Sequence, residues 1–196
     1  MGAQINSWQT NPKMNSRRLP DAVLGMILLV LTEIMFFAAL MSAHTVARAS
    51  VIGGVWPPTG QPRLPLEQTA VNTVVLLLSG VLLWAGNLHL RIEKTKRLRL
   101  VKGSIALGAV FVILQGREWI ALLQEGLTLT SSSLGSYFYL IVGTHALHVL
   151  AAILAMMWAY VGLKRGTIEV HVFAAVRLFW YFVVLLWPVL YLKVYL

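Results

Sequence analysis

The sequence contains no cysteine and few charged residues. Of its 196 residues, 12% are charged and 58% are hydrophobic. Without cysteine the chain has no disulfides, thiolate metal sites, iron–sulfur clusters or cysteine nucleophiles. A soluble domain is about one quarter charged, so this composition and a mean hydropathy of +0.75 exclude an ordinary soluble protein. The sequence therefore indicates an integral membrane protein.

Acidic residues are scarce, with 7 Asp and Glu against 16 Lys and Arg and a net charge of +9. The basic residues stand in short stretches between apolar runs, which is a signal of membrane topology. We therefore expect no nucleic-acid partner. Residues 1–20 are polar and lack an apolar run that ends in a cleavage site, so we expect a polar tail without a cleavable signal peptide.

Five apolar segments are long enough to cross a bilayer, which takes about 20 residues each. Alternation of the kind found in membrane β-barrels is absent. The sequence therefore predicts an all-α membrane protein, a five-transmembrane-helix bundle within one domain over residues 21–196. The predicted helices cover about residues 22–47, 69–91, 101–123, 134–161 and 172–195.

The distribution of Lys and Arg predicts the orientation. The tail and the second and fourth connections hold 3 + 6 + 2 = 11 of these residues, and the first and third connections hold 2 + 0 = 2. Because positive residues concentrate on the cytoplasmic side, we expect a cytoplasmic N-terminus and an external C-terminus. We expect the chain in the inner membrane of a bacterium.

The first apolar run, "LGMILLVLTEIMFFAALMSAH", carries a carboxyl group near its middle, at Glu33. A charge at that depth is costly, so Glu33 should face protein or a polar cavity. His44 follows eleven residues later, which is three helical turns and the same face. The two residues predict a polar stripe on one side of this helix.

The fourth run contains "GTHALH", with His145 and His148 on one helix face. Counted along the helices, His148 lies roughly 20 Å below the outer end and Glu33 roughly 16 Å above the inner end. In a hydrocarbon core of about 30 Å these depths are close. We therefore hypothesise a contact between Glu33 and His148, either direct or through a lipid head group or water.

Three functions compete for these polar residues. These residues fit metal or haem ligation poorly, because two histidines at i and i+3 cannot bind opposite faces of one haem. Proton or ion transport would require a second acidic residue deep in the membrane or a broken helix. A polar site that binds lipid or anchors the bundle needs no further residues. No nucleophile–base pair or phosphate-binding loop is present, so we expect no catalytic residue in this chain.

Other polar and aromatic residues lie nearer the ends of the apolar runs. Arg177, about a turn into the last run, would snorkel or hold a phosphate. The stretch "LQGREW" holds Gln115, Arg117, Glu118 and Trp119 near the outer surface and is interpreted as an interfacial cap with a local ion pair. Most tryptophans are interpreted as interfacial anchors rather than a cofactor site. These are Trp84, Trp119, Trp158, Trp180 and Trp187.

Four motifs in this order resemble subunit III of the haem–copper respiratory oxidases, above all cytochrome c oxidase. They are "LGMILLVLTEIMFF", "WPPTG" followed by "PLEQTAVNTVVLLLSG", "LQGREW", and "GSYFYLIVGTHALHV". The resemblance covers about residues 24–191. The matching positions are Glu33, Trp56, Pro57, Pro58, Asn72, Thr73, Gln115, Glu118, His145 and His148.

The resemblance implies a non-catalytic subunit that packs beside subunit I, which holds the haems and copper, in a complex with subunit II. It implies bound phospholipid, support of proton uptake and protection of the active site during turnover. No haem or metal is then expected in this chain. Glu33 and His148 would belong to a buried polar or lipid-facing site, to which we also assign His44, His145 and Arg177.

The sequence departs from the family pattern in its last helix. Tyr181 and Val184 stand where the family usually has His and Asp. Fuller family members also have two further N-terminal helices. The five-helix form is similar to subunits of ubiquinol oxidases and accessory proteins of nitric oxide reductases, although the Trp-Pro-Pro loop favours cytochrome c oxidase. A small transporter or channel, or a membrane cytochrome, would be an alternative of another class.

Overall fold

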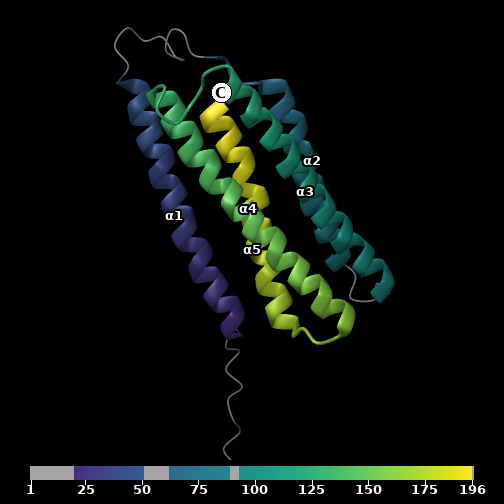
Figure 1. The fold of residues 1–196 in the computed structure, drawn as a ribbon. Coiled ribbons are helices and arrows are strands. Elements are labelled where there is room, and N and C mark those ends of the chain that lie inside the picture. Colours follow the sequence, from purple (N-terminus) through teal and green to yellow (C-terminus); the bar gives the residue numbers. More distant parts are fainter. Residues whose placement is uncertain (1–19, 51–61, 89–92, 196) are drawn as a thin grey trace, which may run out of the picture.

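The computed structural model describes residues 20–50, 62–88 and 93–195, and their regular structure is entirely helical (Figure 1). Five helices are long and apolar enough to cross a membrane, which confirms the predicted all-α fold with five spans. The predicted orientation of the termini stays a prediction. The helices are α1 (Asp21–Ala49), α2 (Leu66–Leu88), α3 (Lys94–Gln124), α4 (Ser133–Arg165) and α5 (Val170–Leu190), with a π-helix η1 (Tyr191–Tyr195) at the end.

The start of α3 differs from the prediction. The sequence placed it at about residue 101 because the preceding stretch is basic, whereas the helix begins at Lys94. Lys and Arg are good helix formers, and their long side chains reach water from a helix end. Several charges assigned to a loop therefore lie on the first turns of α3.

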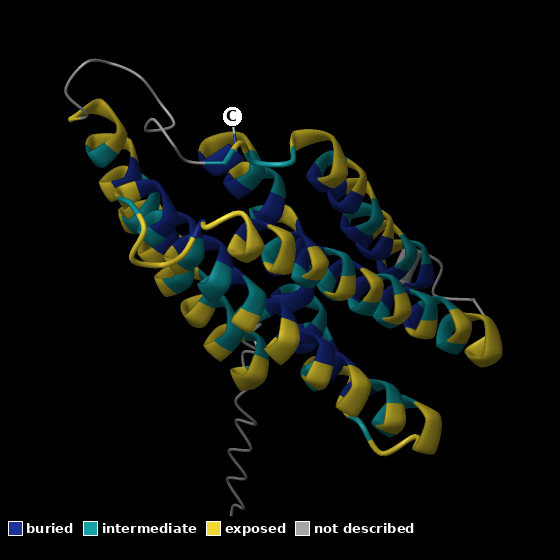
Figure 2. Ribbon diagram, turned by 45° about the horizontal axis from the view of Figure 1, so that its top comes forward, coloured by how far each residue is buried: buried dark blue, intermediate teal, exposed yellow. Residues whose placement is uncertain are grey.

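The fifth helix forms the centre of the bundle. It packs against α1, α2 and α4, while α3 packs against α2 and α4. In Figure 1, α1 lies on one side of the α4–α5 pair, and α2 and α3 lie on the other. Half of the most apolar window of α5 is buried, against 6% for α1. Figure 2 shows buried residues on the inward faces of the helices and exposed residues on their outward faces.

Two tryptophans that we interpreted as interfacial lie in the core instead. Trp180 and Trp187 are almost fully buried, because α5 is surrounded and its large side chains fill the space between the helices. Trp187 Nε1 donates a hydrogen bond to Thr73 Oγ1 at 2.9 Å. A Cβ atom at Gly108 would lie 2.5 Å from Trp180 Cη2, so glycine on α3 leaves room for the Trp180 ring that extends from α5.

Local signals set the ends of α4 and α5. The Ser132 side chain accepts a hydrogen bond from the Gly135 amide at 3.1 Å, and Gly166 ends α4 with a φ of 76°. Pro188 lacks an amide hydrogen, and the chain after it widens into the π-helix η1. Tyr195, at the end of η1, is thereby turned into the bundle, where it is buried.

Candidate functional site

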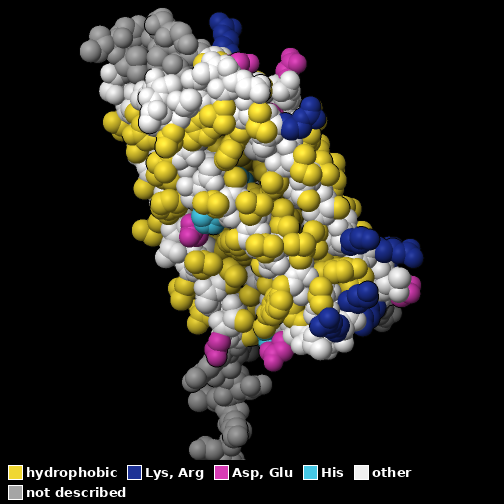
Figure 3. All heavy atoms as spheres, in the orientation of Figure 1, with side chains coloured by type: hydrophobic (Ala, Val, Ile, Leu, Met, Phe, Trp, Pro, Cys, Tyr) yellow, Lys and Arg dark blue, Asp and Glu magenta, His cyan; other side chains and the backbone are white. Residues whose placement is uncertain are grey.

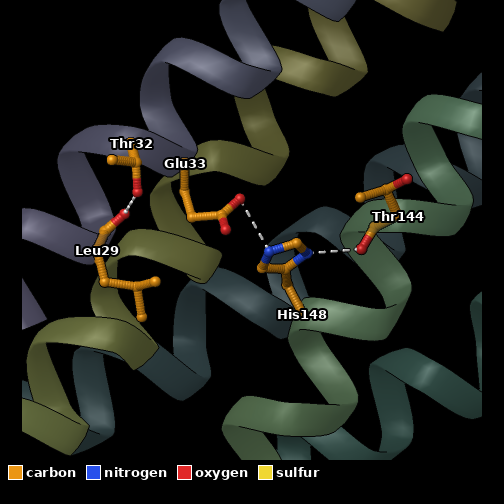
Figure 4. Close-up of polar contacts among 5 residues, drawn as sticks. All are labelled: Leu29, Thr32, Glu33, Thr144 and His148. Carbon is orange, nitrogen blue, oxygen red and sulfur yellow. Dashed lines mark hydrogen bonds and ion pairs between the residues drawn. The ribbon is translucent and has the colours of Figure 1, made fainter.

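The centre of the candidate site is a contact between α1 and α4. Glu33 Oε2 lies 3.0 Å from His148 Nε2, and Figure 4 shows the two side chains pointing towards each other. Both residues lie near the middle of their helices. The direct contact hypothesised from the sequence is therefore present. The side chains stay partly accessible, His148 at 19% and Glu33 at 23%.

The hydrogen bonds of His148 show how many protons the pair holds. His148 Nδ1 lies 2.8 Å from the carbonyl oxygen of Thr144, and a carbonyl can only accept, so Nδ1 carries a hydrogen. The Nε2–Oε2 contact then needs one more hydrogen, either on the imidazole or on the carboxyl group of Glu33. In both forms the pair is neutral overall, which lowers the cost of placing it within a membrane.

Aromatic rings form the inner wall of this pair. The rings of Phe37 and His148 have centroids 5.4 Å apart, and Phe179 lies 6.4 Å from His148. Phe37 is fully buried, so the pair is closed towards the core. Figure 3 shows acidic and histidine side chains adjoining in the middle of an otherwise apolar face. The pair therefore opens sideways, towards whatever surrounds the bundle.

His145 has a different environment from His148. Its ring is buried and stacks on Trp187, with centroids 5.1 Å apart. Neither ring nitrogen has a hydrogen-bond partner among the described residues. His145 also lines an apolar niche of about 150 Å³ between α3 and α4, with Phe111 and Gln115. The two histidines of the motif therefore belong to separate places, and Phe37 contacts both rings.

His44 and Arg177 lie away from the pair, towards opposite ends of the bundle. His44 is buried near the end of α1, and the centroid of its ring lies 5.7 Å from that of the Tyr137 ring. Arg177 lies over the ring of Phe173 at 5.2 Å. The structure therefore brings together only Glu33 and His148 of the five residues assigned to one polar site.

A second polar cluster joins α2, α3 and η1, and the sequence did not predict it. Gln115 is at its centre. The hydrogen bonds run from Thr69 Oγ1 to Glu118 Oε2 (2.8 Å), from Gln115 Nε2 to the same oxygen (3.0 Å) and to Tyr195 Oη (3.1 Å), and from Asn72 Nδ2 to Gln115 Oε1 (3.2 Å). These bonds satisfy buried polar groups of α2 and α3, which would be costly if they were left unpaired.

The interpretation of Glu118 as part of an interfacial ion pair is wrong. Its carboxyl group is buried and accepts hydrogen bonds from Thr69 and Gln115. Within the described residues it forms no ion pair with Arg117, which is exposed. Neighbouring residues on a helix point about 100° apart, so Glu118 faces α2 while Arg117 points outwards.

We expect Gln115→Leu to destabilise the bundle by about 2 kcal/mol, because Asn72, Glu118 and Tyr195 each lose a buried partner. Thermal unfolding of the purified chain in detergent measures the change. Gln124→Leu is the matched control, since Gln124 is exposed near the end of the same helix. Equal effects of the two substitutions would contradict a structural role for the cluster.

Some predicted positions are not placed by the structure. The loop residues Trp56, Pro57 and Pro58 lie outside the described residues. Within residues 20–50, 62–88 and 93–195, no three His, Asp or Glu side chains gather as ligands of a metal ion.

Comparison with known proteins gives consistent matches. Residues 18–196 match the family model described as "Cytochrome c oxidase subunit III". The chain is 35% identical to cytochrome c oxidase subunit 3 of Pongo pygmaeus over 179 residues, which are 87% of this chain and 67% of the relative. The same protein of Damaliscus lunatus is 34% identical over 179 residues, with the same shares. That of Pelomedusa subrufa is 35% identical over 182 residues, also with these shares.

Proposed function

Because this chain belongs to the cytochrome c oxidase subunit III family, we propose that it is a non-catalytic, lipid-binding subunit of a respiratory haem–copper oxidase. It packs beside the catalytic subunit I in a complex with subunit II, and those partners hold the haems and copper. It supports proton uptake and the stability of the active site during oxygen reduction. The chain contributes no catalytic residue of its own.

The observation that carries this proposal is the pair of Glu33 and His148. The two side chains contact each other in the middle of the span region and remain partly accessible from outside the bundle. Hydrocarbon offers no hydrogen-bond partner to the remaining carboxyl oxygen. A lipid head group, a water or a polar group of a neighbouring subunit completes the site. A partly open polar surface of this kind fits a subunit that packs against lipid or another chain.

The outer face of α1 supports the same proposal. Only Phe37 and His44 of this helix are buried, and its apolar window is 6% buried. Lipid and a partner subunit both cover such a face in an assembled complex. Leu28, Leu31, Ile34 and Met35 are among its exposed apolar side chains.

The electron donor and the membrane are finer parts of the proposal. The Trp-Pro-Pro stretch favours an oxidase that takes electrons from cytochrome c, and a ubiquinol oxidase or an accessory protein of a nitric oxide reductase is the second candidate. The relatives compared above come from animals. We propose the inner membrane of a bacterium as the location, in keeping with the excess of Lys and Arg on the predicted cytoplasmic side.

The test is purification of the tagged full chain in a mild detergent, with a reduced-minus-oxidised spectrum and identification of each co-purifying subunit. We expect haem absorption and a large multi-span partner. A c-type or quinone-linked partner identifies the electron donor. A colourless chain that purifies alone and transports solutes in liposomes would contradict the proposal and favour a transporter or channel.

A further inference from the structure

The apolar niche between α3 and α4 contains polar atoms that the protein itself does not satisfy. Its volume is about 150 Å³, and His145 and Trp119 are among the residues that line it. His145 is only 1% exposed. Both ring nitrogens of His145 and the Nε1 atom of Trp119 are buried and have no hydrogen-bond partner among the described residues. Because buried polar groups are normally hydrogen-bonded, a ligand with a polar group would complete this niche.

The neighbours of His145 cannot supply the missing hydrogen bonds. Its ring stacks on Trp187, which donates its one N–H group to α2. The ring of Phe111 stands nearly perpendicular to that of His145, with centroids 6.5 Å apart, and carries no polar atom. The amide nitrogen of Gln115 is already engaged twice in the second polar cluster. A partner for the imidazole must therefore come from outside these side chains.

The size and walls of the niche suit a single ring. An apolar cavity of about 150 Å³ is large enough for benzene. Aromatic and aliphatic side chains form most of the walls, including those of Phe111, Val112 and Val142. At the rim, Leu150 is 44% exposed and Gly116 is partly exposed. A ligand therefore enters from the side, between α3 and α4.

A hydroxyl group suits His145 better than a carbonyl group does. A neutral imidazole has one N–H donor and one bare nitrogen that accepts. A hydroxyl group donates to the bare nitrogen or accepts from the N–H group, whereas a carbonyl group only accepts. Trp119, which lines the same niche, has a second N–H donor to offer.

We propose that the niche between α3 and α4 binds an aromatic ring that bears a hydroxyl group, with the hydroxyl on His145. The ligand class is a phenol that dissolves in the membrane. The site uses neither Glu33 nor His148, which meet on the other side of Phe37. It goes beyond the function proposed above and does not depend on it, because every residue that forms it belongs to this chain.

The experiment titrates the full chain in detergent with 4-fluorophenol and, separately, with fluorobenzene, and follows binding by fluorine NMR. We expect saturable binding of 4-fluorophenol and about tenfold weaker binding of fluorobenzene, the loss expected for one hydrogen bond. His145→Phe keeps a ring but removes the nitrogens, so the two probes should then bind within about twofold of each other. His171→Phe is the matched control, since His171 is exposed at the start of α5, and it should keep the tenfold difference.

Gly116→Leu tests the niche itself and covers a failure of His145→Phe to fold. A Cβ atom at Gly116 meets no atom within 4 Å, so a longer side chain can fill the mouth of the niche without a clash. Binding of both probes should weaken by more than about tenfold, because the ring then has no space. Gly25→Leu on α1 is the control, since a Cβ atom there also meets no atom within 4 Å, and it should leave binding unchanged.

Three results would overturn the inference: no saturable binding of 4-fluorophenol to the parent chain, equal affinity for the two probes, or equal binding in the Gly116→Leu and Gly25→Leu variants. Competition with 4-nonylphenol identifies the source of the ring. Displacement of the probe supports a tailed phenol that enters from the membrane. Binding of 4-fluorophenol without displacement supports a small free phenol.

Discussion

Replacing His148 by leucine is expected to destabilise the bundle by about 3 kcal/mol, the low end of the cost of removing one partner of a buried ion pair, because this pair is only partly buried. The carboxyl group of Glu33 would then lie in the middle of the span region without the hydrogen bond at 3.0 Å. The fully buried Phe37 beside it offers no polar replacement. The free energy of unfolding is measured by titrating the protein with SDS and monitoring its helix content.

The double variant Glu33→Leu with His148→Leu separates the pair from its parts. Replacing both members of a buried pair by apolar residues is often neutral, so we expect its stability within about 1 kcal/mol of the parent. The single variants and the double variant form a cycle whose coupling energy should reach about 3 kcal/mol. Additive effects would show that Glu33 and His148 do not depend on each other.

The same variants test the proposed lipid role through a second measurement. Because the pair opens towards the outside of the bundle, a head group that uses the free carboxyl oxygen should be lost with His148. We expect less phospholipid to be retained by the purified complex of His148→Leu than by the parent. Leu147→Ala is the control, since Leu147 is exposed on the same helix and carries no polar group. Unchanged lipid content would count against His148 as a lipid residue.

The five spans could be predicted because the thickness of the bilayer sets the length of an apolar run. The Glu33–His148 contact could be predicted because depth along a helix follows from a rise of 1.5 Å per residue. The start of α3 could not be predicted in this way, because spans were identified as apolar runs and an apolar run stops at charged residues. A helix does not end there when Lys and Arg continue it into the interface.

Rotation about the helix axis was harder to predict than depth. His145 and His148 are three residues apart, which leaves them about 60° apart around the helix. That angle turns His148 towards α1, while His145 faces Trp187 on α5. Both histidines lie on the same broad face of α4, but only His148 contacts Glu33.

The Gln115 cluster could not be predicted from any one helix, because its members lie far apart in the sequence. Thr69 and Glu118 are 49 residues apart, and Gln115 and Tyr195 are 80 apart. A usable signal was present in the polar positions of α2, which recur at i, i+3 and i+4 in Thr69, Asn72 and Thr73. Such a stripe on an apolar helix predicts polar residues on the helix that packs against it. Gln115 and Glu118, at i and i+3 on α3, are these residues.

Trp187→Ala is expected to cost about 3 kcal/mol of unfolding free energy, mostly through the cavity that it leaves. In a membrane the neighbouring lipid is as apolar as the core, so the cost comes from weaker van der Waals packing rather than from transfer to water. Trp187 is fully buried and donates to Thr73 of α2 at 2.9 Å. It also stacks on His145 of α4, so one side chain joins three helices.

The control for this prediction is Trp158→Ala, because Trp158 is 61% exposed and its removal should change stability by about 0.5 kcal/mol or less. Trp187→Phe keeps a ring but loses the Nε1 donor, and should fall between the two, at about 1 to 2 kcal/mol. SDS titration of all three variants gives the order. If Trp187→Ala were no worse than Trp158→Ala, α5 would not be the centre of the bundle. The packing of α5 against α1, α2 and α4 and the buried hydrogen bond from Trp187 to Thr73 favour the larger effect at Trp187.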